Sequence, residues 1–275
     1  MDEKTKIDSE GIAILKETIN HKYGFDYSGY SEESFVRALK RFIEKNELES
    51  IANVKSRLIE DKNFFKFFVD EMTINTTEMF RDPEFYKSFR EKLISHLDTF
   101  PFIRIWVAGC SSGEEAYSIA ILLKEENILH KTIIYATDIN EEALFTAKLG
   151  LFDESKTTLY NSNYKNSGGK LELSDYYTKQ LNKNVINTDL KEHVVFSYHN
   201  LVSDSSFNEF HIIICRNVMI YFNEELKQKT MNLFNNSLVR MGHLILGTAE
   251  SSPTTTNFLE YVDIDGKQNI FQKKK

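Results

Sequence analysis

Two glycines and two adjacent glutamates stand together in residues 103–120, where the chain reads IRIWVAGCSSGEEAYSIA. The alternating apolar residues at the start of this stretch predict a short buried strand. The apolar spacing from Ala116 onward predicts a helix. A strand, a glycine turn and a helix together bring backbone N–H groups close to a bound cofactor. We therefore expect a cofactor site at the turn that contains Gly109 and Gly113.

The acidic residues of this turn narrow the class of cofactor. A dinucleotide site uses G-x-G-x-x-G so that the backbone can approach a pyrophosphate, and the turn lacks that spacing. Glu114 and Glu115 would repel a pyrophosphate, but they suit a ligand with an ammonium group, such as the methionine end of S-adenosylmethionine. A nicotinamide oxidoreductase is therefore disfavoured. The alternative is an ordinary turn in which both glutamates complement the helix dipole.

A third carboxylate lies at the end of the next predicted strand, TIIYAT (132–137), which Asp138 follows. Acidic residues at this position commonly accept hydrogen bonds from the ribose hydroxyls of an adenosine cofactor. Asp138 could instead cap the helix expected over residues 141–149. Because Asp138 follows a glycine turn and its helix, we favour the ribose role.

An amide, a hydroxyl and a guanidinium group occur within a few residues of one another at Asn75, Thr77 and Arg81. These residues interrupt the helical pattern, and Pro83 is suited to begin the next helix. An arginine in this setting can hold a carboxylate in a fixed orientation. The alternative is a capped loop, with Thr77 as the N-cap and Arg81 on the surface.

The composition excludes several classes of protein. A net charge of −7 over 275 residues leaves no broad basic surface for nucleic acid. Cys110 and Cys215 both lie in apolar, strand-like surroundings, and two such cysteines make neither a disulfide framework nor a metal site. They fit a reducing, cytoplasmic setting. The polar N-terminus predicts no signal peptide, and no apolar run approaches the length of a membrane span.

The apolar pattern divides the chain into two parts. Residues 1–88 predict a helical N-terminal domain, with helices over 8–22, after a cap at Ser31, over 49–60 and over 62–72, and with the phenylalanine-rich run 64–68 in its core. Residues 89–275 alternate strands and helices, which is typical of a Rossmann-like α/β domain. Its later part predicts strands at 194–196, 211–215 and 243–247, a helix from about 223 to about 240, and a strand after 267. The polar segment 151–192 is either a small inserted lobe or a long loop.

Several segments together resemble one family, the chemotaxis-receptor glutamate methyltransferases of the CheR type. The matching segments are NTTEMFRDPEF (75–85), IWVAGCSSGEEAYSIA (105–120), YATDIN (135–140), FSYHNL (196–201) and FHIIICRNVMIYF (210–222). The last segment is long and chemically unusual, so the resemblance is specific, and it spans nearly the whole chain. It implies a helical N-terminal domain joined to a Rossmann-like methyltransferase domain, with a small inserted β-subdomain at 151–192. One departure is GTAE at 247–250, where the family often has G-H-S-E.

The resemblance also implies the residues of the site. The cofactor-binding positions include Gly109 in the glycine turn. The implied contacts are Asn75, Thr77 and Arg81 at the methionine portion, Glu115 at the ammonium group, Asp138 at the ribose, Asn200 and Leu201 at the adenine, and Arg216 and Asn217 near the methyl donor. Arg81 and Tyr221 would act on the substrate carboxylate, which makes them the expected catalytic residues. For Tyr221 the alternative is a core tyrosine with a satisfied hydroxyl.

The implied reaction transfers a methyl group from S-adenosylmethionine to receptor glutamates, giving glutamate methyl ester and S-adenosylhomocysteine. A glutamate is already ionised at neutral pH, because its free pKa is about 4.3, so no general base is required. The expected partner is the cytoplasmic helices of a methyl-accepting chemotaxis receptor, and the expected enzyme is a cytoplasmic monomer. Two alternatives remain open here: a carboxyl methyltransferase that acts on a non-chemotaxis protein, and a non-catalytic module that senses S-adenosylmethionine.

Two segments bear on how a receptor would dock. The second helix carries a basic stripe of Arg37, Lys40, Arg41 and Lys45. Such a stripe is usually a solvated face, but here it is a candidate docking surface for acidic receptor helices. The segment 151–192 does not match the family version that clamps a receptor's C-terminal tether peptide. We therefore expect docking that does not depend on a tether.

Overall fold

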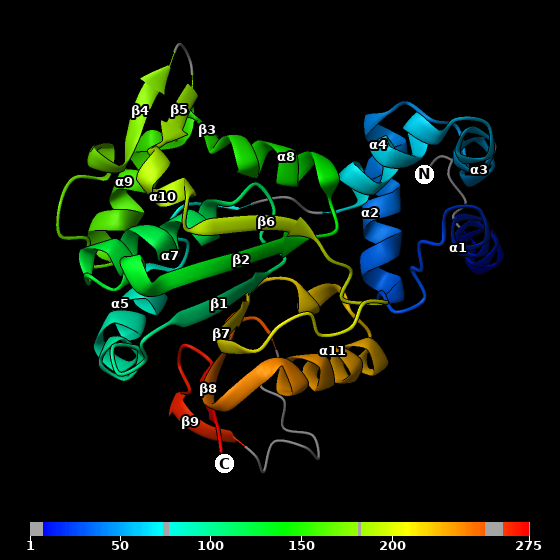
Figure 1. The fold of residues 1–275 in the computed structure, drawn as a ribbon. Coiled ribbons are helices and arrows are strands. Elements are labelled where there is room, and N and C mark those ends of the chain that lie inside the picture. The colour runs from blue at the N-terminus through cyan, green and yellow to red at the C-terminus, as the bar shows by residue number, and fades with distance from the viewer. Residues whose placement is uncertain (1–7, 74–76, 181–182, 251–260, 275) are drawn as a thin grey trace. The chain divides into compact units, whose positions relative to one another are not determined.

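The apolar runs of the sequence form a seven-stranded sheet in the computed structural model (Figure 1). The structure describes residues 8–73, 77–180, 183–250 and 261–274. The strand order is β6 (Val194–Tyr198), β2 (Thr132–Asp138), β1 (Ile103–Ala108), β7 (Phe210–Cys215), β8 (Leu238–Leu246), β10 (Ile270–Lys273) and β9 (Tyr261–Asp265). The strands from β6 to β8 are parallel, whereas β10 runs antiparallel to both β8 and β9. This confirms the predicted Rossmann-like α/β fold.

The register of the parallel strands places the functional turns at one edge. Ala108 pairs with Thr137, so the glycine turn after β1 and Asp138 at the end of β2 lie side by side. On the other side of β1, Val107 pairs with Ile214, two residues before Arg216. The chain order reverses between β1 and β7, because β2 and β6 continue to one side and β8 to the other. Ligands of open α/β sheets bind outside the carboxyl ends of the strands at such a reversal.

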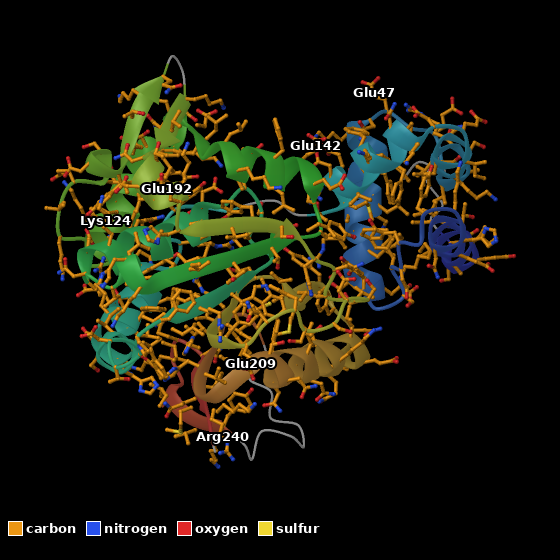
Figure 2. The ribbon with its side chains drawn as sticks, viewed as in Figure 1. Glu47, Lys124, Glu142, Glu192, Glu209 and Arg240 are labelled. Atoms are coloured by element: carbon orange, nitrogen blue, oxygen red, sulfur yellow. The ribbon has the colours of Figure 1, made fainter. Side chains whose placement is uncertain are left out.

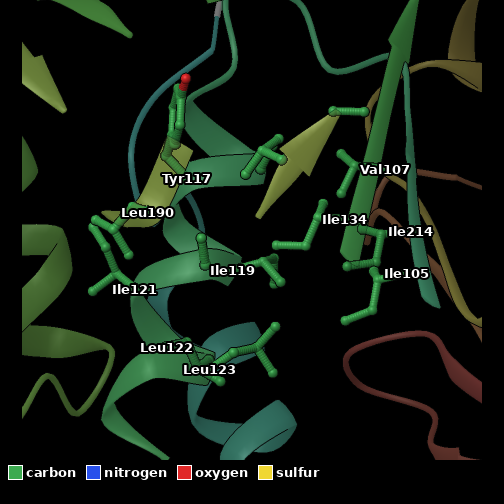
Figure 3. Packing of buried hydrophobic residues seen from close by; sticks show 14 of the residues in the cluster. Ile105, Val107, Tyr117, Ile119, Ile121, Leu122, Leu123, Ile134, Leu190 and Ile214 are labelled. Atoms are coloured by element: carbon green, nitrogen blue, oxygen red, sulfur yellow. The ribbon is translucent and has the colours of Figure 1, made fainter. Parts of the chain in front are cut away.

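Helix α7 (Glu114–Glu125) covers one face of this sheet. Its apolar side chains, among them Ile119 and Leu122, face Ile105, Val107 and Ile134 of the strands in one buried cluster (Figure 3). Helix α8 (Glu141–Leu149) adds Leu144 and Ala147 to the same cluster. Because α7 is apolar on nearly every side, it forms the centre of the core rather than a surface helix.

Trp106 fills the opposite face of the sheet, because successive strand residues point to opposite sides. Its ring packs 5.3 Å from Phe234 of α11 (Glu224–Ser237) and 5.3 Å from Phe210 of β7. The indole N–H donates a 2.8 Å hydrogen bond to Thr137 Oγ1, beside the glycine turn. Trp106 is the single tryptophan of the chain, so its fluorescence reports on this part of the sheet.

The helical N-terminal part forms a compact unit of its own. Unit 1 contains residues 1–74 and 221–230, and unit 2 contains residues 75–220 and 231–275. The helices of unit 1 are α1 (Ser9–Tyr23), α2 (Glu32–Lys45), α3 (Ile51–Glu60) and α4 (Lys62–Met72). Asp8 caps α1, and Ser31 caps α2 as predicted, each accepting a backbone N–H. Phe67 is an exception to the predicted core run, with 40% of its surface exposed. Neighbouring phenylalanines in a helix cannot all lie on one face.

The helix after Pro83 belongs to unit 2 rather than to the N-terminal helices. Helix α5 (Pro83–Lys92) buries Phe85, Tyr86 and Phe89 in the same cluster as the sheet, and the short α6 (Ile94–Leu97) adds Leu97. The division between the compact units therefore falls at residue 74, earlier than the domain boundary at 88 that the sequence predicts. The apolar periodicity of α5 shows that one face is buried, but it does not show which unit that face packs against. The sequence pattern alone therefore does not assign α5 to a domain.

The polar segment 151–192 folds as a small lobe and not as a long loop. Its strands β3 (Leu151–Asp153), β5 (Lys183–Ile186) and β4 (Tyr177–Gln180) form a separate antiparallel sheet. Helices α9 (Thr157–Asn166) and α10 (Thr188–Lys191) complete the lobe. Buried Glu125 at the end of α7 holds it, because its carboxylate accepts hydrogen bonds from the hydroxyls of Tyr164 and Tyr176. The predicted inserted β-subdomain is thus confirmed.

Two boundaries and one strand differ from the sequence prediction. Helix α11 ends at Ser237, and β8 already begins at Leu238 and runs through Leu246. Strand β9 is not predicted by the sequence, because its alternation is short and acidic. Within the described residues, no helix is both long and apolar enough to cross a membrane.

Candidate functional site

The glycine turn after β1 has a backbone that other residues would strain. Gly109 and Gly113 have φ values of +77° and +95°, in the left-handed region that glycine favours. The N–H groups of Gly109 and Cys110 donate to the carbonyl of Thr137 at 2.8 and 3.0 Å, which fixes the turn to the end of β2. A Cβ on Gly113 would lie 3.0 Å from the Cβ of Ala147, so the turn also packs closely on α8.

Asp138 joins this turn to the start of α8. Its carboxylate accepts the N–H of Ser111 at 2.7 Å and the N–H of Asn140 at 2.9 Å. Burial raises the pKa of Asp138, and these backbone donors oppose that shift. Asp138 does not cap α8, because the side chain of Asn140 accepts the N–H of Ala143. Each carboxylate oxygen can accept a further hydrogen bond, so the predicted ribose contact is chemically open.

The two glutamates that begin α7 have different partners. Glu114 is buried, and its carboxylate accepts hydrogen bonds from Ser112 Oγ at 2.7 Å and from the Tyr160 hydroxyl at 3.3 Å. Burial raises the pKa of Glu114. Glu115 instead forms an ion pair with Arg216, whose Nη1 lies 2.5 Å from Glu115 Oε1. Glu115 is therefore the glutamate of this turn that lies beside a cation.

Arg216 ties together three segments that are far apart in the sequence. Besides Glu115, its guanidinium donates to the Asp82 carboxylate at 2.8 Å and to the Arg81 carbonyl at 3.2 Å. It also lies over the ring of Phe85, 4.3 Å from the centroid. Burial lowers the pKa of Arg216, but the nearby Glu115 charge, Tyr86 and Asp82 outweigh that effect and raise it overall. Arg216 thus stays charged and fixes the segment 81–82 against the start of α7.

The segment before α5 is held at its backbone. The Phe80 N–H donates to Ser118 Oγ of α7 at 2.9 Å, and the Met79 carbonyl accepts Asn163 Nδ2 of α9 at 3.1 Å. Phe80 and Asp82 both have positive φ values, 54° and 57°. Thr77 and Arg81 are half-buried, and the Arg81 carbonyl accepts a hydrogen bond from Arg216 at 3.2 Å. Asn75 lies outside the described residues.

The remaining predicted positions follow β6 and β7. Asn200 and Leu201 are buried, and the Asn200 side chain accepts the N–H of Val202 at 2.9 Å, which forms a turn. This turn is joined to β2 because the His199 N–H donates to the Asp138 carbonyl at 3.2 Å. Asn217 follows Arg216 with a left-handed φ of 60°. The structure therefore places the candidates that follow β1, β2, β6 and β7 at the carboxyl edge of these strands; they are Gly109, Glu115, Asp138, Asn200, Leu201, Arg216 and Asn217.

Comparison with known proteins identifies the family. The model of the CheR methyltransferase, SAM binding domain, matches residues 75–267. The chain belongs to the CheR methyltransferase family. The Cher3 protein of Pseudomonas putida is 37% identical over 262 residues, which cover 95% of this chain and 96% of that protein. The chemotaxis protein methyltransferase of Vibrio parahaemolyticus is 31% identical over 255 residues, 85% of this chain and 86% of the relative. That of Listeria innocua is 29% identical over 234 residues, with coverage of 84% and 86%.

This CheR-family chain is an S-adenosylmethionine-dependent methyltransferase. The residues of its site fit that cofactor. The carboxylates of Glu115 and Asp138 match a ligand with a cationic end and sugar hydroxyls. The assignment does not favour the other classes considered from the sequence, an oxidoreductase or a non-catalytic sensor.

Sequence reasoning missed two residues of this CheR-family site. Asp82 precedes Pro83, which suggests an N-cap, but the structure turns its carboxylate to Arg216 and gives it no capping bond. Asn163 lies in the polar insert, and nothing in its surroundings indicates the contact with Met79. Tyr221 belongs to unit 1, where its carbonyl accepts the N–H of Ser31. Its predicted role at the substrate stays a prediction.

Proposed function

We propose that this enzyme methylates glutamate side-chain carboxylates on the cytoplasmic helices of a methyl-accepting chemotaxis receptor. The extent of the similarity to chemotaxis protein methyltransferases carries the proposal. The alignment with the Vibrio parahaemolyticus relative covers 85% of the chain, a share that unit 2 alone cannot supply. The similarity therefore includes part of the helical unit as well as the cofactor domain. A carboxyl methyltransferase that acts outside chemotaxis is the second candidate, and no observation favours it.

The chemistry asks little of the protein beyond orientation. When bound, S-adenosylmethionine supplies an electrophilic methyl group that a carboxylate oxygen can accept by displacement, without loss of a proton. The carboxylate of a substrate glutamate is already ionised at neutral pH, since its free pKa is about 4.3. The protein must align the two reactants and remove the water between them. We assign the alignment of the substrate carboxylate to Arg81 and Tyr221.

Cofactor recognition is assigned to the carboxyl edge of the sheet. Glu115 would bind the ammonium group, and Asn75, Thr77 and Arg81 would bind the rest of the methionine portion. Asp138 would bind the ribose hydroxyls, Asn200 and Leu201 would flank the adenine, and Arg216 and Asn217 would lie near the methyl donor. An Asp138→Ala variant tests this set by calorimetric titration with S-adenosylhomocysteine. We expect binding to be lost in the variant while the wild-type protein binds, and equal binding by both would refute the assignment.

Receptor docking is assigned to the exposed part of the basic stripe on α2. Arg41 donates to the carbonyl of Glu71, and Lys45 forms a 2.7 Å ion pair with the Glu71 carboxylate, so both are tied to α4. Arg37 and Lys40 are exposed and face solvent. We therefore place the contact with acidic receptor helices at Arg37 and Lys40, on a surface that needs no receptor tether.

Receptor methylation provides the decisive assay. The enzyme is mixed with membranes that contain the receptor and with S-adenosylmethionine carrying a labelled methyl group. We expect receptor label that alkali releases as methanol, because carboxyl methyl esters are base-labile. We also expect Arg37→Glu with Lys40→Glu to lower receptor labelling while the affinity for S-adenosylhomocysteine stays unchanged. Lys267→Glu, at an exposed lysine of unit 2, is the matched control. Base-stable label, or labelling that the α2 reversals do not change, would contradict the proposal.

The last part of the proposal concerns the oligomeric state and the compartment of the enzyme. We propose a monomer that works in the cytoplasm. The two cysteines, Cys110 and Cys215, are both buried and unpaired in the structure, as expected in a reducing compartment. Light scattering across a range of protein concentrations tests the monomer, and a mass that rises with concentration would contradict it.

A further inference from the structure

A buried glutamate beside the cofactor site has no role in the mechanism above. Glu250 is 5% exposed, and it follows β8 at the carboxyl edge of the sheet. Burying an ionised carboxylate is costly unless hydrogen-bond donors replace the lost water. No lysine, arginine or histidine forms an ion pair with Glu250 among the residues that the structure describes. The compensation must come from uncharged donors.

Backbone N–H groups of two turns supply that compensation. Glu250 Oε1 accepts the N–H of Val218 at 2.8 Å and the N–H of Met219 at 2.9 Å. Glu250 Oε2 accepts the N–H of Gly247. Burial raises the pKa of Glu250, and these donors, together with the N–H of Asn217, oppose that shift. One carboxylate thus holds the turn after β7 to the turn after β8.

The turn that Glu250 holds also forms one wall of the glycine turn. Val218 packs directly on Gly109, where any Cβ would come closer than 3.0 Å to the Val218 side chain. In the same turn, Arg216 forms the ion pair with Glu115. Movement of residues 216–219 would therefore displace both the Gly109 backbone and the partner of Glu115.

A second contact closes the arrangement from the other side. Asn269, in the turn before β10, donates from Nδ2 to the carbonyl of Gly247 at 2.8 Å and to the carbonyl of Glu250 at 3.3 Å. Gly247 lies so close to the turn after β7 that an added Cβ would be 3.0 Å from the Asn217 nitrogen. Asn269 therefore fixes the backbone from which the Glu250 side chain extends.

We infer that Glu250 is a positioning residue for S-adenosylmethionine binding, which acts by fixing residues 216–219 against Gly109 and Glu115. It does not need to touch the cofactor. The inference concerns the cofactor site alone, so it does not depend on which protein is methylated.

The test separates positioning from simple stability. Glu250→Gln preserves the size of the side chain but removes the charge and places an NH₂ group where an acceptor is needed. Calorimetric titration with S-adenosylhomocysteine, well below the unfolding temperature, gives the dissociation constant and the number of binding sites. We expect the dissociation constant to rise roughly tenfold or more, which corresponds to about 1.4 kcal/mol, with the number of sites unchanged. A purely structural role would lower the number of sites and leave the dissociation constant of the folded protein unchanged.

Two controls and a milder variant complete the design. Glu142→Gln makes the same substitution at an exposed position on α8 (Figure 2). Ser237→Ala removes a buried hydroxyl that bonds to Leu233 and Ser206, so it weakens unit 2 without touching residues 216–219. Both controls should keep the wild-type dissociation constant. If Glu250→Gln does not fold, Asn269→Ala tests the same anchor, and we expect a smaller rise at full site number. Wild-type affinity in whichever of these two anchor variants folds would overturn the inference.

Discussion

Replacing Gly109 by alanine tests whether the glycine turn and the turn after β7 form one packed unit. The substitution has two separate costs. An L-residue at φ +77° loses about 1–2 kcal/mol, because its Cβ approaches the following carbonyl oxygen. The new methyl group would also come closer than 3.0 Å to one Val218 methyl and within 3.3 Å of the other. Overpacking of this kind costs about 1–3 kcal/mol. We therefore expect Gly109→Ala to lose about 2–5 kcal/mol of the free energy of unfolding.

The two costs can be measured separately. Gly168→Ala has nearly the same φ, +80°, but its nearest neighbour would be 3.9 Å away, so it measures the backbone cost alone. Val218→Ala combined with Gly109→Ala removes the steric conflict and leaves the backbone cost. The double variant should therefore lose about 1–3 kcal/mol less free energy of unfolding than the summed losses of the two single variants.

Urea unfolding followed by Trp106 fluorescence is the appropriate assay, because Trp106 is the single tryptophan and is buried in unit 2. Titration with S-adenosylhomocysteine should show the same ranking, with Gly109→Ala binding weakly and the double variant recovering affinity. Two results would refute the reasoning. The first is a Gly109→Ala variant that is no less stable than Gly168→Ala. The second is a double variant whose loss of free energy of unfolding equals the sum of the losses in the two single variants.

Two further predictions follow from single contacts. Asn163→Ala removes the hydrogen bond to the Met79 carbonyl and should weaken S-adenosylhomocysteine binding by roughly three- to tenfold, the worth of one neutral hydrogen bond. Asn166→Ala, at an exposed position of the same helix, should bind like wild type, and equal affinity in the two variants would contradict the prediction. Burial lowers the pKa of His243 to about 4. The unfolded chain titrates near 6.5, so the stability due to the neutral ring is complete above that pH and is lost as the pH falls toward 4. The free energy of unfolding of the wild-type protein, measured in urea, should fall by about 2 kcal/mol between about pH 7 and pH 5. The free energy of unfolding of His243→Phe should fall by less. An equal fall in the two proteins would exclude His243 as the cause.

Local sequence patterns predict many strands and helix caps of this fold, because interactions between residues close in the sequence determine them. The alternation in 103–108 becomes β1, and the acid after TIIYAT lies at the end of β2. The caps at Asp8 and Ser31 follow from the preference of helix N-termini for short oxygen-bearing side chains. Where a prediction fails, a distant neighbour decides. Phe67 is 40% exposed although its ring lies 5.7 Å from that of Phe42 of α2, and β9 exists because β10 pairs with it.

The site shows the same division between what is local and what is distant. Gly109 and Asp138 could be placed from the sequence because the ends of neighbouring parallel strands meet at one edge. The ion pair of Arg216 with Glu115 joins residues 101 positions apart, and nothing in either segment specifies the other. The resemblance to the CheR type supplied both residues as cofactor contacts, but it did not indicate that they bind each other. Such pairs can be found only when the fold brings the segments together.

The carboxylates of this edge set the shape of the turns that bind the ligand. Asp138 accepts N–H groups from the glycine turn and from the start of α8, and Glu250 accepts them from the turns after β7 and β8. Glu115 instead pairs with a guanidinium. A change at Asp138 would remove the proposed ribose contact and also loosen the turn, so we expect its effect on affinity to have two causes. A change at Glu250 loosens a turn without removing any assigned ligand contact. The loss of affinity at Glu250 therefore measures the effect of turn shape alone. Subtracting it from the loss at Asp138 estimates how much affinity comes from the ligand contact itself.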